Sequence, residues 1–241
     1  MFYKKSCKKG QAAALLLGIL VISGAVAKKG LEKIFGPGAD IFIIQLVKHP
    51  TEVGALVPCS KFVAYEITAS IREQRQKNPD KPLRILEVGA GNGIFTSQII
   101  KEAPENSHID VIEINADFCE LLRNQFAHLP NVFVHEIDVL QFNPSLQYDV
   151  IISALPFNIF QDEFLSNIFN HYKALIVKGG SLSYFEYCAL MNIKKIFLPS
   201  KELMLLEKKL SIISNFREKY LKKSVKVLAN VPPVYVHHLD F

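Results

Sequence analysis

The chain has 241 residues, of which 49% are hydrophobic and 21% charged, and its formal net charge at pH 7 is +5. This length suffices for one α/β domain with a core plus an N-terminal extension, and the composition excludes a long disordered segment. The lysines and arginines are scattered along the chain, which argues against a dedicated nucleic-acid-binding protein. The four cysteines lack the C-x-x-C spacing of a zinc site, so we expect no metal.

Residues 1–30 combine apolar and basic character. Gln11–Ala27 is a run of seventeen uncharged residues, and lysines flank it on both sides. As a helix it would be about 26 Å long, short of a hydrocarbon core of about 30 Å. A signal peptide ending at Ala25–Ala27 and a helix packed on the domain are the alternatives. We expect this segment to anchor a cytoplasmic protein to an anionic membrane, with its orientation left open.

The next region reads as helical. Leu31–Lys48 is a helical approach segment broken at Gly36–Gly38, and His49–Tyr65 is a connector entering a helix that continues toward Lys77. Asn78–Pro82 is then a linker, because its two prolines cannot continue a helix.

A buried strand running into a glycine turn follows, at residues 83–93. Gly89, Gly91 and Gly93 allow a tight turn and a close approach of the backbone to a ligand. Glu87 stands two residues before the first glycine. A dinucleotide-binding G-x-G-x-x-G motif would need glycine at position 94, where this chain has isoleucine. The pattern is instead E-x-G-x-G-x-G.

Three further strand patterns end in polar residues. His108–Asn115 carries Glu113, 24 positions after Gly89, at the place where an acidic residue can hold both hydroxyls of a ribose. Asn131–Ile137 leads into Asp138, and Tyr148–Phe157 ends in a Pro-aromatic turn. The parts of the chain between and after these strands predict helices at about 94–103, 116–128, 160–177 and 189–222, and strands at Ser181–Tyr187, Val225–Val231 and Val234–His238.

Alternating strands and helices predict a doubly wound, Rossmann-like α/β fold with a seven-stranded sheet. The sheet is expected to be mostly parallel. The last two strands are joined through Pro232–Pro233, a link too short for a parallel crossover, so they must be antiparallel.

The glycine pattern and the acidic strand ends resemble class I S-adenosylmethionine-dependent methyltransferases. The resemblance implies S-adenosylmethionine as cofactor and three regions: a membrane-associating segment (1–30), a helical substrate-side extension (31–81) and the methyltransferase domain (82–241). The residues that it assigns to the cofactor are Glu87, Gly89, Ala90, Gly91, Asn92, Gly93, Glu113, Ile114, Asp138, Val139 and Ser153.

Two families with this arrangement differ at the methyl acceptor. In ribosomal RNA adenine dimethyltransferases the fourth strand ends in Asn-Leu-Pro-Tyr/Phe, and the asparagine accepts a hydrogen bond from the adenine amine. This chain has Ala154–Phe157, with alanine at the amide position. That departure counts against RNA as the methyl acceptor, and a ribosomal RNA adenine dimethyltransferase is kept as the alternative hypothesis.

Bacterial phospholipid N-methyltransferases, which methylate phosphatidylethanolamine, resemble more of the chain, over about residues 40 to 239. Their short motifs are matched by Gly54–Ser60, Ser153–Pro156, Tyr184–Tyr187 and Asn230–Pro233, with departures at Cys59, Tyr184 and Glu186. The resemblance implies a phospholipid amine at a membrane surface as the acceptor, with the oligomeric state unknown. The residues that it places at the acceptor are Ser60, Leu155, Pro156, Phe157 and Tyr184.

Methyl transfer to an amine requires positioning of the two reactants and removal of a proton from the ammonium. Tyr187, Glu186 and His135 are the candidate proton acceptors at the carboxyl edge of the sheet. Aromatic side chains such as Phe157 and Tyr184 are suited to hold the cationic product by cation–π contact. A cofactor-binding protein without catalysis is a further alternative, but it would have no need for Glu87, Glu113 and Asp138 together.

Overall fold

The computed structural model describes residues 59–157, 160–188, 200–230 and 232–241. Gln11–Ala27 and the predicted helix at Leu31–Lys48 lie outside these ranges, as does most of Gly54–Ser60. Within the described part of the chain, no helix has both the length and the apolar character needed to cross a membrane.

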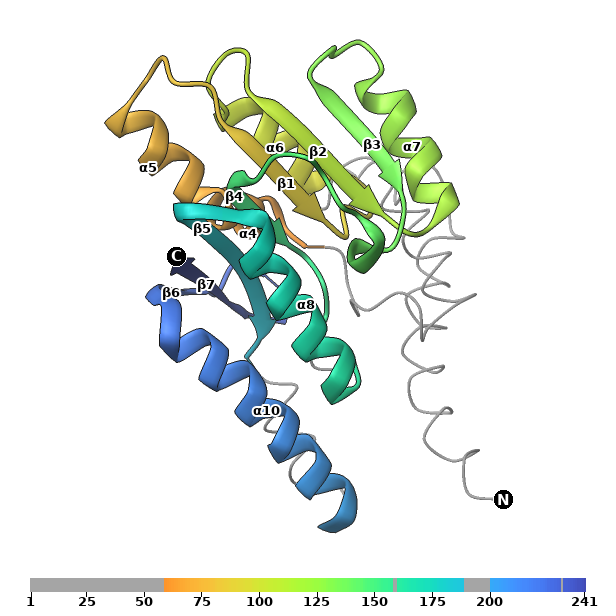
Figure 1. The fold of residues 1–241 in the computed structure, drawn as a ribbon, viewed down its shortest axis with the longest axis vertical. Helices are drawn as coiled ribbons and strands as arrows, with labels where there is room; N and C mark the ends of the chain where they lie inside the picture. The colour runs from red at the N-terminus through yellow and green to blue at the C-terminus, as the bar shows by residue number, and fades with distance from the viewer. Residues whose placement is uncertain (1–58, 158–159, 189–199, 231) are drawn as a thin grey trace.

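The core of the fold is a seven-stranded sheet with the order β3-β2-β1-β4-β5-β7-β6. The first five strands pair in parallel, and β7 runs antiparallel to both of its neighbours. The predicted fold class is therefore confirmed (Figure 1). The strands are β1 (Arg84–Val88), β2 (His108–Glu113), β3 (Val132–Glu136), β4 (Tyr148–Ser153), β5 (Ile176–Tyr187), β6 (Leu221–Val227) and β7 (Val234–Asp240).

Helices cover both faces of the sheet (Figure 1). One face packs against α4 (Lys61–Ile67), α5 (Ala69–Lys77), α6 (Ile94–Glu102) and α7 (Ala116–Phe126). The other packs against α8 (Asp162–Leu175) and α10 (Ser200–Tyr220). Successive strand residues point to opposite faces, so the neighbours Ile85 and Leu86 enter different cores. Burial on both faces explains why the inner strands are continuously apolar.

The structure differs from the sequence-based expectations at three elements. Thr68 separates α4 from α5, where one helix was expected, and its hydroxyl donates to the carbonyls of Ala64 and Tyr65. β5 begins at Ile176, so Gly179 and Gly180 lie inside the strand rather than before it. β6 begins at 221, where a helix was expected to continue, because an edge strand tolerates lysines on its exposed side.

Candidate functional site

The loop between β1 and α6 contains three glycines with positive φ angles: 77° at Gly89, 54° at Gly91 and 80° at Gly93. A Cβ atom at Gly93 would lie 2.8 Å from Cδ2 of Leu122, and one at Gly89 would lie 3.2 Å from Cδ2 of Leu155. At Gly91 it would meet no atom of the described residues within 4 Å. Two of the glycines are therefore needed for packing, whereas Gly91 borders open space where a ligand can approach the backbone.

Glu113 ties this loop to the end of β2. Its Oε2 accepts a hydrogen bond from the Gly91 amide at 2.8 Å, and its Oε1 accepts from the amides of Ile114 and Asn115 at 2.8 and 2.9 Å. A carboxylate has about four acceptor positions, so these three donors leave capacity for a ligand hydroxyl. The neighbouring Ile114 is 69% exposed and offers an apolar surface beside the carboxylate.

Glu87, next to the last residue of β1, is fully buried. Its Oε2 accepts from the Thr96 hydroxyl at 2.6 Å, whereas its Oε1 has no hydrogen-bond partner among the described residues. Burial raises the pKa of this carboxyl to about 8, with the Thr96 hydrogen bond opposing the shift and the charge of Glu113 adding to it. An unpaired buried carboxylate oxygen is costly, and an amino group at the loop would satisfy it. The loop thus fits the aminoacyl end of S-adenosylmethionine.

The remaining cofactor candidates lie around this loop in less exposed positions. Ala90, Asn92 and Val139 are buried. Asp138 accepts from the Leu140 amide at 2.8 Å and caps the short 3-10 helix η1 (Val139–Gln141). The Ser153 hydroxyl is 2.9 Å from that of Tyr172 on α8. Their direct contact with a cofactor stays a prediction.

The turn after β4 lies against the glycine loop. The Ala154 amide donates to the Val88 carbonyl at 2.9 Å, and Leu155 and Pro156 are half-buried. Phe157, by contrast, is 2% exposed and packs its ring 5.0 Å from that of Phe169. The structure therefore places Phe157 in the core and not on a surface where it could face an acceptor.

Two distant segments meet at the same edge of the sheet. The Ser60 amide donates to Oδ1 of Asn230 at 2.9 Å, across 170 residues of sequence. Both residues belong to the short motifs shared with phospholipid methyltransferases. Tyr184, another predicted acceptor contact, is fully buried on β5 with its ring 5.1 Å from that of Phe157.

The three candidate proton acceptors are not brought together. Glu186 and Tyr187 end β5, where Oε2 of Glu186 accepts from Nη1 of Arg217 at 3.3 Å. His135 lies on β3, four strand positions from β5, which corresponds to roughly 19 Å at about 4.8 Å per strand. Its Nε2 is 2.7 Å from Oδ1 of Asp110. The geometry therefore gives no support to a shared role for His135 and the other two residues.

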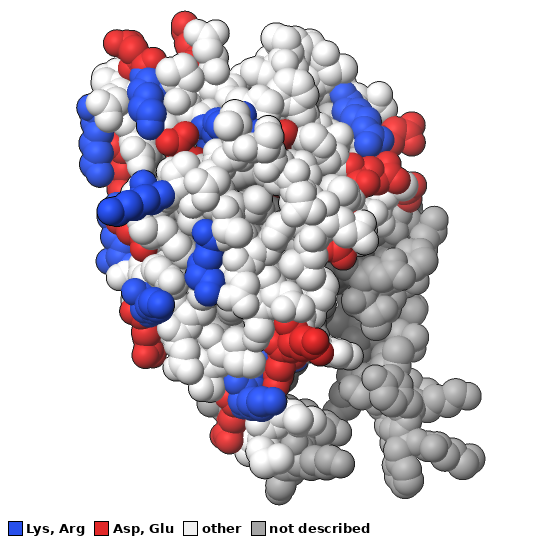
Figure 2. Space-filling view, viewed as in Figure 1, with Lys and Arg blue, Asp and Glu red and all other residues white. Residues whose placement is uncertain are grey.

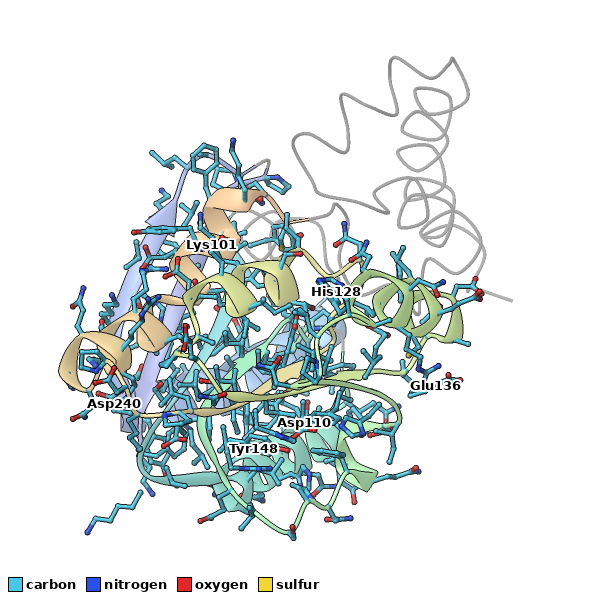
Figure 3. All side chains as sticks on the ribbon, turned by 90° about the horizontal axis from the view of Figure 1, so that it is seen from above. Lys101, Asp110, His128, Glu136, Tyr148 and Asp240 are labelled. Carbon is cyan, nitrogen blue, oxygen red and sulfur yellow. The ribbon has the colours of Figure 1, made fainter. Side chains whose placement is uncertain are left out.

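Asp110 is a polar hub that the sequence did not reveal. It is 4% exposed, and His108, His135 and Tyr148 all hydrogen-bond to it at 2.7–2.8 Å. Asp110 and Tyr148 are labelled in Figure 3.

His237 on β7 was also not predicted from the sequence, because its position beside Tyr184 depends on antiparallel pairing across the sheet. No group of three or more potential metal ligands forms a site within the described residues.

Comparison with known proteins identifies the domain. Residues 85–180 match the protein family described as "Methyltransferase domain". This match and the fold support an S-adenosylmethionine-dependent methyltransferase. The match covers the glycine loop, Glu113 and the turn after β4.

Similar curated proteins methylate different acceptors. A malonyl-[acyl-carrier protein] O-methyltransferase of Ilyobacter polytropus is 36% identical over 104 residues, 43% of this chain and 38% of that protein. An ornithine lipid N-methyltransferase of Singulisphaera acidiphila is 27% identical over 149 residues, 59% of this chain and 74% of that protein. An rRNA adenine N-6-methyltransferase of Lysinibacillus sphaericus is 35% identical over 81 residues, 33% of this chain and 32% of that protein. The chain thus spans about two fifths or less of the length of two of these relatives.

Among solved structures, the N-methyltransferase NodS from Bradyrhizobium japonicum WM9 superimposes with a TM-score of 0.54 and 14% sequence identity. The match covers 74% of this chain and 96% of that one. At this identity the similarity establishes the fold alone. The chain therefore has the Rossmann-like methyltransferase architecture.

Proposed function

We propose that the protein is an N-methyltransferase that acts on the amine of a phospholipid headgroup like that of phosphatidylethanolamine. The observation that carries this proposal is the Ser153–Pro156 turn, which lies directly against the glycine loop and has the Ser-x-Leu-Pro form without an amide. The similarity to the ornithine lipid N-methyltransferase supports it, because that match covers most of the relative's length.

In this proposal, residues of the first three strands hold S-adenosylmethionine, which supplies an electrophilic methyl group. The unpaired oxygen of Glu87 would receive the amino group of the cofactor, and the remaining acceptor capacity of Glu113 would receive its ribose hydroxyls. Ile114 supplies the apolar surface for the adenine, and Asp138 accepts from the adenine amine. The backbone at Gly91 leaves the room for this approach.

Methylation of an RNA adenine is the second candidate, because an rRNA methyltransferase is among the similar proteins. Two features of the turn speak against it. Ala154 has no side-chain amide to orient the adenine amine, and Phe157 is buried and presents no open ring face for a flipped base. On the face shown in Figure 2, lysines and arginines alternate with acidic residues and form no continuous basic patch. Phospholipid therefore remains the favoured acceptor.

The acceptor is tested by incubating the protein with labelled S-adenosylmethionine, total bacterial lipid and undermethylated ribosomal RNA. We expect label in the chloroform-soluble material. Label in RNA would replace the proposal with adenine methylation. Cofactor binding without transfer to either would favour a non-catalytic cofactor-binding protein.

We further propose that residues 1–29 bring the cytoplasmic enzyme to an anionic membrane, since a lipid acceptor keeps its acyl chains in the bilayer. Six lysines in this segment would each contribute about 1 kcal/mol near such a surface. Deletion of residues 1–29 should leave cofactor affinity unchanged while strongly reducing co-sedimentation with anionic vesicles and lipid turnover. Undiminished sedimentation of the truncated protein would exclude this segment as the membrane contact.

A further inference from the structure

Three buried side-chain atoms that lack a hydrogen-bond partner among the described residues gather near the carboxyl end of β5. They are Oη of Tyr184, Oε1 of Glu186 and Nε2 of His237. Strand pairing sets Tyr184 opposite His237, their ring centroids are 5.1 Å apart, and Nε2 of His237 lies 3.6 Å from Oε2 of Glu186. Arg217 and Glu186 also lie near the Tyr184 hydroxyl and interact with it, but neither forms a hydrogen bond of good geometry. Buried polar groups are nearly always paired, so three atoms without a well-formed hydrogen bond in one place indicate a binding site.

The other polar atoms of these side chains are already engaged. The Ser224 hydroxyl lies 2.7 Å from Nδ1 of His237, and Arg217 donates to Oε2 of Glu186 at 3.3 Å. Tyr184 and His237 are 0% and 5% exposed, so neither can turn to solvent for a partner. Burial, followed by the charge of Glu186, raises the pKa of Tyr184 well above its usual range, and its hydroxyl therefore stays protonated.

The cluster lies near the edge of the sheet at which the proposed cofactor site is found. Tyr184 pairs with Ser153, the last residue of β4, and Ser153 pairs with Val88, the last residue of β1. The glycine loop and the acceptor turn begin immediately after Val88 and Ser153. Since neighbouring strands are about 4.8 Å apart, the cluster on β5 and β7 is one to two strands from that turn. A ligand bound in it is therefore within reach of the turn.

The chemistry of the unpaired atoms favours an amine over an anion as the ligand. An anion such as phosphate would meet the free oxygen of Glu186 and be repelled. An amine supplies the hydrogen-bond donors that Glu186 and His237 lack, and the aromatic ring of Tyr184 beside His237 favours a cation.

We propose that Tyr184, Glu186 and His237 bind the amine of the methyl acceptor and that His237 takes its proton. The inference rests on the proposed function. Nε2 of a neutral His237 would accept one proton from the ammonium, and the freed nitrogen lone pair would form the bond to the methyl carbon. The bond from that carbon to the sulfonium sulfur of S-adenosylmethionine would break, its electron pair would stay on sulfur, and S-adenosylhomocysteine would be the leaving group. Glu186, paired with Arg217, stabilises the imidazolium that forms. Imidazole suits this role because one ring nitrogen can accept a proton while the other keeps its contact with the Ser224 hydroxyl.

A matched control lies one residue away. His238 is on the same strand but faces the opposite side of the sheet, with Ser183 at 2.8 Å and Glu66 at 3.3 Å from its ring nitrogens. We therefore compare His237→Gln with His238→Gln in the full chain. The titratable and charged groups around His237 that bear on the pH dependence are Tyr184, Glu186, Arg217, Lys226, Tyr235 and His238.

Binding is measured first, without turnover, by nuclear magnetic resonance of histidine-labelled protein. Ethanolamine should shift the signal that is absent from His237→Gln, and ethylene glycol, which has no amine, should not. In the lipid assay, His237→Gln should lower kcat/KM at pH 7 by roughly 100-fold, the usual scale for a general base. It should also abolish the fall of kcat/KM toward acid pH, and His238→Gln should keep that fall.

Failure of this inference and failure of the proposed function are distinguishable. Active wild-type enzyme with equal rates and pH profiles for His237→Gln and His238→Gln would overturn the role of His237 and leave lipid methylation standing. An ethanolamine shift at His237 in a protein that methylates no lipid would support the amine pocket and overturn the lipid acceptor. Absence of the ethanolamine shift would overturn the pocket whatever the activity.

Discussion

The two halves of the sheet hold their polar side chains in different ways. On the β1–β3 side, Glu113 is bound by three backbone amides, two of them from its immediate neighbours. On the β4–β7 side, polar contacts join residues far apart in sequence, such as Glu186 with Arg217 and Ser60 with Asn230. The cofactor loop of the first half is thus fixed by backbone amides, whereas the second half, like the Asp110 cluster on β2, depends on particular side chains. We infer that the second half determines which acceptor is used.

The largest expected effect is at Gly91. Gly91→Val should abolish cofactor binding, because the side chain would fill the open space beside the loop. Gly179→Val is the matched control, since Gly179 also has a positive φ and no atom within 4 Å of its Cβ position, but lies on β5. Both variants carry similar backbone strain, so calorimetric titration should detect binding in the control alone. Equal binding by the two would show that the loop faces no cofactor.

Loss of the Glu113 carboxylate should weaken cofactor binding by about 1.5–3 kcal/mol, or roughly 10- to 150-fold. Glu136 pairs with Glu113 in register on β3 and is exposed there beside Arg123, so Glu136→Ala is the control. Isothermal titration of Glu113→Ala and Glu136→Ala with S-adenosylmethionine measures the difference. Unchanged affinity in Glu113→Ala would remove the ribose contact from the proposal.

Glu87 makes the cofactor affinity depend on pH. Burial raises its pKa to about 8, so at pH 6 the carboxyl is protonated, whereas pairing with the cofactor amino group needs the ionised form. Affinity should therefore rise between pH 6 and 7.5, by at most tenfold per pH unit, with a proton released on binding. In Glu87→Gln the affinity should be flat over this range. A wild-type protein with the same flat profile would contradict the pairing.

The smallest effect concerns the contact between Ser60 and Asn230. Asn230→Ala leaves the buried Ser60 amide unpaired and should lower the free energy of unfolding by roughly 1–2 kcal/mol. Asn230→Asp keeps an acceptor for Ser60 but loses the donor to the Pro232 carbonyl. Denaturant unfolding measures stability, and acceptor KM should rise in Asn230→Ala without a change in cofactor affinity. A parallel loss of cofactor affinity would show that the two halves are not independent.

The sequence predicted the β1–β3 half well because its signals are local. Glycine spacing and strand periodicity located the loop, and the count from Gly89 located Glu113 at the end of its strand. In the other half, strand pairing across dozens of residues decides what a side chain meets. Phe157 was therefore expected at the acceptor and lies in the core, and His237 was not singled out at all. The edge strand β6 was misread in part because its lysines resemble a helical surface.

The hydrogen bond from the Gly91 amide to the Glu113 carboxylate also bears on the speed of the catalytic cycle. A loop that is already fixed by hydrogen bonds within the protein loses little conformational entropy when a ligand binds. Exchange of the spent cofactor for a fresh one then requires no refolding of the loop. Any methyltransferase must make this exchange after every transfer, and a preformed loop keeps that step short.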